Sequence, residues 1–373
     1  MSVIKSISTY SHINDLQGRV WNPAIRWTQK HAIFIEVESD DGFIGLGEAW
    51  CFDTAPDCLL AYIATEVVPA FLGRDIADLE TISDALLRRA TLTSRHGILS
   101  SALSAFDIAC HDIRAKAADK PLHQHLSTDG SGTVQLYASG GLYGQDKDVN
   151  ALVHEMTGFA QKGYQTVKMK IGALDLREDL VRVKAVLDAL PDDHRVIIDA
   201  VYSYTPQVAL EMFEALPHER IEAFQAPVRA DDITGMAWLV KQGVPVMAVE
   251  AEYRPELHKA MIDEDAVRFL QTAPIACGGA SRVSTLSKSL QGTPIRLSLE
   301  VSSTAVALMA ACQMAAADPS IAHVEYHTIH DVFYDRLSLS PVGKGGSHKL
   351  SDKPGLGISL PHNEVRHVAN YKP

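Results

Sequence analysis

The sequence predicts an α/β protein of the TIM type, a (β/α)8 barrel preceded by a smaller α+β capping domain. From residue 134 onward, eight short runs rich in β-branched residues alternate with amphipathic stretches of helical period, including 177–190, 206–216 and 303–317. The runs are residues 134–139, 166–171, 196–199, 221–225, 246–250, 267–271, 295–299 and 322–326. No glycine-rich phosphate turn follows the first run, so a closed barrel is favoured over an open doubly wound sheet.

The capping domain is predicted from the segment before the barrel. Residues 2–11 and 31–38 have strand patterns, and Asp40-Asp41-Gly42 is a hairpin turn signal that leads into another short strand. An alanine-rich helix is expected over 100–118, and the turn-rich segment from residue 341 is expected to pack back on the cap. The predicted division is therefore 1–125 for the cap, 126–340 for the barrel and 341–373 for the returning segment.

The composition and charge limit the kinds of partner that the protein is expected to bind. The 373 residues are 46% apolar and carry 34 basic against 46 acidic side chains, a net charge of −12 with no basic cluster, which argues against nucleic acid as a partner. No run of eighteen apolar residues and no signal-peptide pattern occurs, so we expect a cytoplasmic protein without a membrane partner. Five scattered cysteines without C-x-x-C spacing are expected to be buried and reduced: Cys51, Cys58, Cys110, Cys277 and Cys312.

The second barrel strand carries the strongest functional signal. Alternation places Val167, Met169 and Ile171 toward the helices, and Lys168 and Lys170 toward the barrel interior. Two ammonium groups inside a barrel are costly, so the competing interpretation, a pair of surface lysines, requires the strand assignment to be wrong. Crowding of two cations, with a metal nearby, is expected to lower a lysine pKa toward the range of a general base.

Oxygen-bearing side chains end the next three strands. Asp199, Gln225 and Glu250 follow one another at intervals of about one β/α unit, so they converge on the same rim of the barrel. Any one of them alone is better explained as a helix cap or a salt-bridged acid. Together they predict a Mg2+ site, because hard cations prefer oxygen ligands; Glu252 is the alternative to Glu250.

These residues resemble the enolase superfamily, in its mandelate racemase subgroup (mandelate racemase/muconate lactonizing enzyme-like). The resemblance covers nearly the whole chain. Besides the lysine pair, it rests on Gly42-Phe-Ile-Gly-Leu-Gly47-Glu48, Ala105-Phe-Asp-Ile-Ala109, Tyr137-Ala-Ser-Gly-Gly-Leu142, Asp199-Ala200, Phe224-Gln-Ala-Pro227, Gly278-Gly279 and Pro354-Gly-Leu-Gly357. It implies that Lys170 is the base, that Lys168 touches the substrate carboxylate, and that Mg2+ with lysine stabilises an enediolate.

The chain departs from that family pattern at several positions. Gln225 stands where the family has a metal-binding acid, which should weaken the site. The family's His-Asp dyad is missing: its aspartate position reads as Ala273 and its histidine position as Glu300, which is either an unusual acid or base or a structural residue. Glu325 sits where related enzymes place an acid near the substrate carboxylate, and it can donate if protonated.

Substrate specificity in this family comes from loops of the capping domain. Here the resemblance points to residues 14–27, where Arg26, Trp21 and Trp27 can meet an anionic substrate, and to the loop over 50–56. Tyr143 and Tyr202, expected in loops after the first and third strands, are further candidates. Surface or packing roles are the alternative for each of them.

The residues and the resemblance together predict an enzyme that acts on a small-molecule carboxylate, most simply a dehydratase of a hydroxy or sugar acid. Elimination needs one base and a leaving hydroxyl. A racemase, epimerase or cycloisomerase is the alternative, and a racemase needs a second base, for which Glu300 is the obvious applicant. A catalytically impaired ligand-binding barrel is the third hypothesis, and a homo-oligomer is expected.

Overall fold

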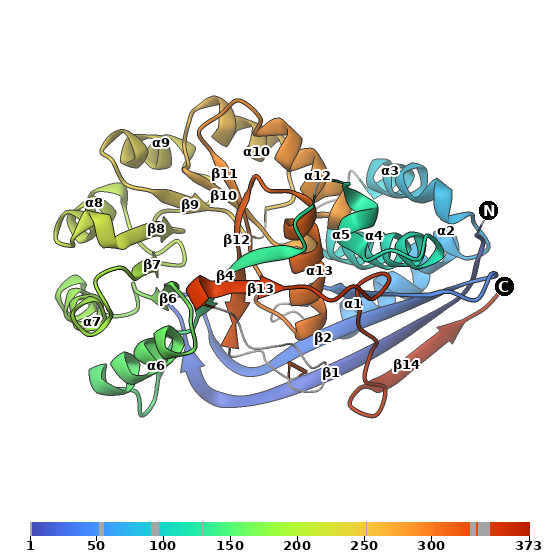
Figure 1. The fold of residues 1–373 in the computed structure, drawn as a ribbon, viewed down its shortest axis with the longest axis horizontal. Helices are drawn as coiled ribbons and strands as arrows, with labels where there is room; N and C mark the ends of the chain where they lie inside the picture. The colour runs from blue at the N-terminus through green and yellow to red at the C-terminus, as the bar shows by residue number, and fades with distance from the viewer. Residues whose placement is uncertain are drawn as a thin grey trace.

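Eight parallel β-strands close into a barrel in the computed structural model, because the last strand pairs with the first (Figure 1). The structure describes residues 2–51, 56–90, 97–128, 130–250, 252–328, 333–334 and 344–373. The barrel strands are β4 (Thr133–Ser139), β6 (Thr166–Lys170), β7 (Arg195–Asp199), β8 (Ile221–Gln225), β9 (Val246–Ala248), β10 (Phe269–Thr272), β11 (Arg296–Leu299) and β12 (Ile321–His327). The predicted fold class is thus confirmed.

Helices cover the outside of this barrel. They are α6 (Val149–Gln161), α7 (Leu176–Ala189), α8 (Pro206–Glu214), α9 (Ile233–Lys241), α10 (Pro255–Asp263), α11 (Pro274–Cys277), α12 (Gly279–Ser289) and α13 (Ala305–Ala317). Each of the first seven strands is followed by at least one of them, whereas β12 is followed by no α-helix within the described part of the chain. Residues 329–332 and 335–343, which follow this strand, lie outside the described residues.

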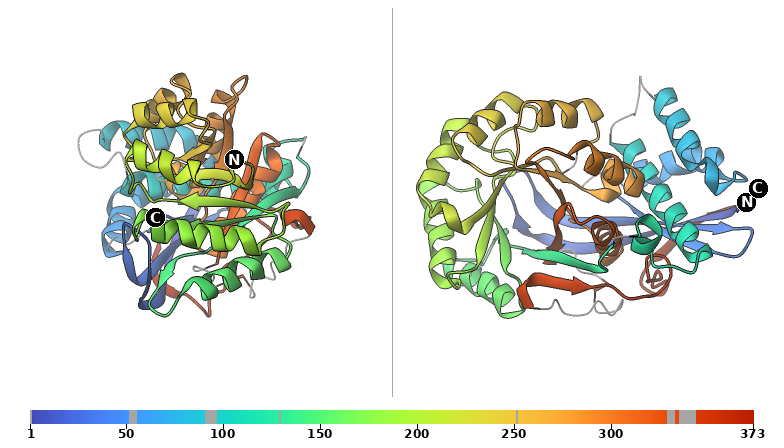
Figure 2. Two further views of the ribbon diagram at one scale, coloured as in Figure 1. Left: turned by 90° about the vertical axis from the view of Figure 1, so that its left-hand side faces the viewer. Right: turned by 45° about the horizontal axis from the view of Figure 1, so that its top comes forward.

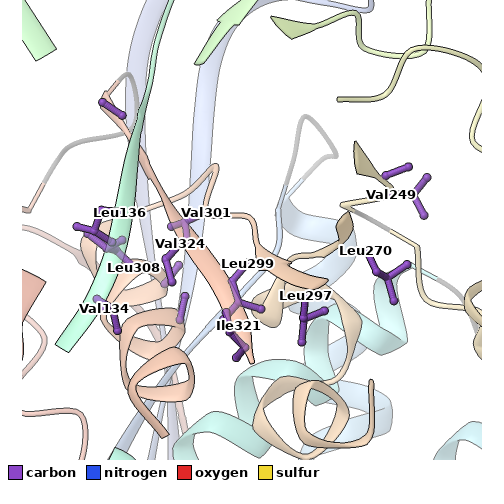
Figure 3. Close-up of a cluster of buried hydrophobic side chains, with 14 of the residues drawn as sticks. Val134, Leu136, Val249, Leu270, Leu297, Leu299, Val301, Leu308, Ile321 and Val324 are labelled. Atoms are coloured by element: carbon purple, nitrogen blue, oxygen red, sulfur yellow. The ribbon is translucent and has the colours of Figure 1, made fainter. Parts of the chain in front are cut away.

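Two layers of side chains pack the barrel. A large outer cluster lies between the strands and the helices, and Figure 3 shows part of it, where Leu299 of β11 and Val324 of β12 lie with Leu308 of α13. A smaller inner cluster fills the barrel itself, with Tyr137 and Met247 among its members. Polar side chains occupy the interior beyond this apolar layer, toward the carboxyl ends of the strands.

The capping domain is an antiparallel sheet covered by helices. The sheet runs in the order β14-β1-β2-β3, with β14 (Arg366–Tyr371), β1 (Ile4–Trp21), β2 (Arg26–Ser39) and β3 (Ile44–Ala49). Its helices are α1 (Pro56–Tyr62), α2 (Val68–Phe71), α3 (Leu79–Arg89), α4 (Ile98–Ala117) and α5 (Leu122–Leu126). Because β14 pairs with β1, the C-terminal segment returns to the cap, and both termini lie at the same end of the molecule (Figure 2).

Two sequence predictions are wrong in detail. Residues 14–27 were expected to form a loop, but most of them extend β1 and β2 into one long hairpin, whose tip pairs with β5 (Tyr143–Gly144) of the barrel domain. Cys58 is exposed on α1, whereas the other four thiols are buried; none of the five is in a disulfide. Among the described helices, none combines the length and apolar character needed to cross a membrane.

Candidate active site

Lys168 and Lys170 project into the barrel from β6, while Val167 and Met169 pack in the outer cluster, as the period of two predicts. The two lysines are only 1% and 7% exposed. The end of β6 is fixed from outside, because Arg182 of α7 donates to the carbonyl of Lys170 at 3.0 Å. The lysine pair is therefore held on a rigid strand end.

Lys168 lies at the centre of a buried polar network. Its Nζ is 2.5 Å from Glu325 Oε1 and 3.8 Å from Asp199 Oδ2, and it donates to Gln225 Oε1 at 2.9 Å. The ammonium also lies 5.3 Å from the centre of the Tyr137 ring. Burial alone would raise the pKa of Glu325, but Lys168 and neighbouring positive charges lower it to about 2. These positive charges favour the ionised form of Glu325, and the sequence hypothesis that a protonated Glu325 donates to the substrate stays a prediction.

Lys170 forms an ion pair with Asp199 at the end of β7. Burial lowers the pKa of Lys170, but the charges of Asp199 and Glu325 outweigh burial, so the pKa is raised. The sequence prediction of a lowered lysine pKa includes a nearby metal ion as well as the second lysine, and it stays a prediction, because only the protein groups contribute here. The surrounding carboxylates determine that the pKa of Lys170 is raised and not lowered. A further positive charge among these carboxylates is needed to lower it.

Asp199 and Glu250 provide the carboxylates of the predicted metal site. Glu250 lies just beyond β9 and accepts a hydrogen bond from Tyr202 at 2.6 Å, and Asp199 Oδ1 accepts one from the backbone N–H of Val201 at 3.0 Å. Burial and the charge of Asp199 raise the pKa of Glu250, which indicates two acids held close together. Such a pair fits a hard cation such as Mg2+.

The amide oxygen of Gln225, the third predicted metal ligand, already accepts two hydrogen bonds. Oε1 accepts from Lys168 at 2.9 Å and from Gln271 Nε2 at 3.4 Å, and Gln271 also donates to Tyr137 at 3.1 Å. Both lone pairs of the oxygen are thereby engaged. No group of three His, Cys, Asp or Glu side chains suited to a metal occurs in the described ranges. The metal site stays a prediction, with Asp199 and Glu250 as its carboxylates.

The carboxylate of Glu252, the alternative metal ligand, is occupied by hydrogen bonds to neighbouring residues. Its carboxylate accepts hydrogen bonds from the backbone N–H groups of Tyr253 and Arg254 and from the Arg254 guanidinium, at 2.7–3.0 Å. These contacts cap the turn before α10 and leave Glu250 as the second carboxylate.

Glu300 follows β11 and is almost completely buried. Burial and the negative charge of Glu325 raise the pKa of Glu300 to about 8, against the opposing effect of Lys168. Its Oε2 has no hydrogen-bond partner among the residues that the structure describes. Burial and the charge of Glu325 therefore favour the protonated form of Glu300.

Two polar residues at this rim were missed by the sequence reasoning. His327 ends β12 two residues beyond Glu325 and is buried, and burial together with Lys170 and Lys168 lowers its pKa well below the usual value. Lys30 of β2 reaches the barrel from the cap, and its Nζ donates to the carbonyl of Ser302 at 3.2 Å. The inward parity that His327 shares with Glu325 is the signal that could have found it.

The remaining predicted substrate contacts lie around the hairpin tip and have structural partners. Arg26 is exposed, with its guanidinium 3.9 Å from the centre of the Trp21 ring, and Trp21 stacks on Tyr143. Tyr143 is buried and donates to Asp179 at 2.6 Å. Trp27 is buried near Lys30, with 6.0 Å between the Lys30 ammonium and its ring centre. Of the predicted loop at 50–56, residues 52–55 lie outside the described residues.

A lysine pair, two carboxylates and a buried acid thus lie at the carboxyl end of a (β/α)8 barrel. The chain belongs to the mandelate racemase/muconate lactonizing enzyme family of the enolase superfamily. Residues 24–127 match its N-terminal domain, and residues 150–364 match the family described as enolase C-terminal domain-like. The predicted family and the prediction of an enzyme of this superfamily are confirmed.

Known relatives span more than one reaction. Arabinonate dehydratase of Saccharolobus solfataricus is 28% identical, over 96% of this chain and 97% of its own length. D-galactarolactone cycloisomerase of Agrobacterium fabrum is also 28% identical, over 96% of both chains. A racemase from Streptomyces coelicolor, solved with bound magnesium, shares the fold, with 21% identity, a TM-score of 0.85 and coverage of 98% and 100% of the two chains. Superfamily members generally use Mg2+.

Proposed function

We propose that this enzyme is a dehydratase of polyhydroxy acids, in which Lys170 removes the α-proton and Glu300 protonates the departing β-hydroxyl. The observation that carries the proposal is Glu300. It is a buried carboxyl group at the mouth of the barrel, its pKa is raised to about 8, and its Oε2 is unsatisfied among the described residues. A group that is protonated at neutral pH is an acid ready to donate.

The α-proton is removed by the residues of β6. A proton next to a carboxylate is weakly acidic, so positive charge must meet the carboxylate oxygens as negative charge develops on them. Lys168, held by Glu325, supplies a fixed ammonium for that purpose. Lys170 lies two residues nearer the rim on the same face of β6. In its neutral form, its Nζ can accept the α-proton.

Asp199 and Glu250 would hold Mg2+. When bound, the ion supplies a Lewis acid for the substrate carboxylate and neutralises the carboxylates that otherwise keep Lys170 protonated. Tyr202 orients Glu250 through its hydrogen bond, and the N–H of Val201 orients Asp199.

The leaving group departs toward Glu300. The electron pair of the broken Cα–H bond forms the carbon–carbon double bond, the β-carbon–oxygen bond breaks, and the Glu300 proton completes a water molecule. The product is the enol of a 2-keto-3-deoxy acid, and Glu300 is left as a carboxylate that solvent reprotonates. Glu325 is less suited to this role, because Lys168 and neighbouring positive charges lower its pKa and favour the ionised form.

Epimerisation is the second candidate function. A carboxyl group with a pKa of about 8 is partly ionised in mildly alkaline solution, so Glu300 can also serve as a base on the substrate face that Lys170 does not reach. In that case Glu300→Gln blocks exchange from one epimer only.

The test is a screen of sugar acids for 2-keto-3-deoxy products, followed by Glu300→Gln on the best substrate. We expect the variant to lose turnover by about 100-fold or more while Lys170-dependent exchange of the α-hydrogen survives.

Wild-type kcat should fall as the pH rises above about 8, because Glu300 is then deprotonated, and this fall in kcat should be absent in the Glu300→Gln variant. Glu219→Gln, at an exposed position, is the matched control. Unchanged kinetics in Glu300→Gln would refute the role of Glu300.

A further inference from the structure

Asp179 is a fully buried carboxylate in the first turn of α7, and the proposed reaction does not use it. Its side chain accepts three hydrogen bonds. Oδ2 accepts from the backbone N–H of Gly172 at 2.6 Å, and Oδ1 accepts from the hydroxyl of Tyr143 at 2.6 Å and from the Arg182 guanidinium at 2.7 Å. The cost of burying this carboxylate is thus offset by one charged partner and two neutral donors.

Two of these contacts hold the turn that follows β6. Gly172 stands two residues after Lys170, the proposed base at the end of that strand. The hydroxyl of Tyr143, which donates to Asp179, also accepts from the backbone N–H of Ala173 at 3.1 Å. Asp179 and Tyr143 therefore bind two successive N–H groups of the chain as it leaves the base.

Arg182 extends the contact to the backbone of Lys170 itself. Besides its ion pair with Asp179, its guanidinium donates to the carbonyl of Lys170 at 3.0 Å and to the carbonyl of Gly141 at 3.4 Å. The N–H of Lys170 donates to the same Gly141 carbonyl at 3.3 Å. Both peptide groups of Lys170 are thus held, which restrains its two backbone dihedrals and the direction in which its side chain leaves the strand.

The Asp179–Arg182 pair lies on the helix side of β6, whereas the Nζ of Lys170 lies on the inner side and pairs with Asp199. Replacing a buried ion pair by apolar residues of similar volume is often neutral for stability, so such a pair is weak evidence for a stabilising role. The hydrogen bonds described for this pair go to the two turns beside the base. That placement suits a role in orienting Lys170.

We propose that Asp179, together with Arg182, is a positioning residue for Lys170, which fixes the end of β6 so that Nζ is aimed at the α-carbon of the substrate. The inference rests on the proposed function, because it takes Lys170 as the base. A lysine side chain is long and flexible, so its reach depends on where its backbone is fixed. A displacement of about 1 Å at a reacting group can lower the rate about 100-fold.

The experiment compares wild type with Asp179→Asn, Arg182→Met and Arg182→Lys. The asparagine keeps the shape of the side chain but turns one acceptor oxygen into a donor. Exchange of the substrate α-hydrogen with deuterated water is measured at saturating substrate, substrate affinity by calorimetry, and the position of Lys170 by crystallography. Asp263→Asn, in an exposed ion pair with Lys259 on α10, is the matched control.

We expect Asp179→Asn and Arg182→Met to slow exchange by about 100-fold while substrate affinity stays within about threefold of wild type. Arg182→Lys should recover part of the rate, because it restores the cation. In crystals of Asp179→Asn, Lys170 should leave Asp199 while Lys168 keeps its contact with Glu325. If Asp179→Asn fails to fold, Tyr143→Phe, which removes only the hydroxyl, should slow exchange by about tenfold.

An unmoved Lys170 in crystals of Asp179→Asn would overturn the inference, even where no acid is turned over. Equal losses of exchange rate and affinity would also overturn it, since they indicate general damage to the site. Lys170→Ala is measured in parallel. If that variant keeps exchange, the proposed function fails; if it loses exchange while Asp179→Asn keeps the wild-type rate, only the positioning role fails.

Discussion

Lys168 is the residue around which the buried charges of this barrel are arranged. An ammonium that is 1% exposed must be paired, and it has Glu325 and the amide of Gln225 as direct partners, with Asp199 a little farther away. The amide of Gln225 is neutral, so it can accept from Lys168 without adding a carboxylate. This explains how a glutamine can stand where the family has a metal-binding acid.

Gln225→Glu tests this interpretation. We expect the variant to bind Mg2+ about tenfold more tightly or better, because a third carboxylate joins Asp199 and Glu250. The new charge also competes for Lys168, so turnover should fall rather than rise. Calorimetric titration with Mg2+ gives the affinity, and Gln242→Glu, at an exposed position, is the control. An unchanged Mg2+ affinity would mean that position 225 does not face the cation site.

At the scale of single residues, a sequence can place side chains on one strand but not across the barrel. The period of two was enough to direct Lys168 and Lys170 inward, and strand ends were enough to select Asp199, Gln225, Glu250 and Glu300. The hydrogen bond from Gln271 to Gln225 joins two strands, and no local pattern encodes it. The same holds for Lys30, which comes to the mouth from a different domain.

At the scale of elements, the Gly-Leu-Gly segment of β3 explains how the cap is packed. A Cβ atom on Gly47 would lie 2.0 Å from the carbonyl oxygen of Ala105 in α4, and one on Gly45 would lie 2.0 Å from that of Ala109. The strand and the helix therefore approach each other backbone to backbone. Gly47 and the Ala-Phe-Asp-Ile-Ala motif of α4 therefore pack directly against each other.

Gly47→Ala is expected to destabilise the protein by about 3 kcal/mol or more, because neither backbone can move without disturbing its element. Unfolding in urea measures the change. Gly158→Ala in α6 is the matched control, since a Cβ there meets no atom within 4 Å and alanine favours a helix by up to about 1 kcal/mol over glycine. Equal stability of the two variants would show that β3 and α4 are not in close contact.

Most barrel strands could be predicted because their apolar runs are short and regularly spaced. The inner half of the hairpin of β1 and β2 was predicted as well, from residues 2–11 and 31–38. Its outer half could not be predicted, because its residues alternate between exposed and half-buried. Its partners, including β5, come from the barrel domain. Tertiary pairing, and not local hydrophobicity, extends these strands.

At the scale of the whole molecule, the candidate site lies in the barrel, close to the contact between the two domains. The barrel supplies the lysine pair, the carboxylates and Glu300, and Lys30 of the cap donates to the carbonyl of Ser302, two residues beyond Glu300. The order of elements along the chain predicted this division, since an α+β segment precedes eight barrel strands. The choice among dehydration, epimerisation and cycloisomerisation could not be predicted, because it depends on which acid faces the substrate across the mouth.

The most direct test of the account is exchange of the substrate α-hydrogen with deuterated water, followed by NMR, in wild type, Lys170→Ala and Lys168→Ala. Lys170 is proposed as the base itself, so its variant should show neither exchange nor turnover, while Lys168→Ala should retain a trace of both. Circular dichroism spectra of the variants guard against misfolding. Exchange by Lys170→Ala within about tenfold of the wild-type rate would contradict the central claim that Lys170 removes the proton.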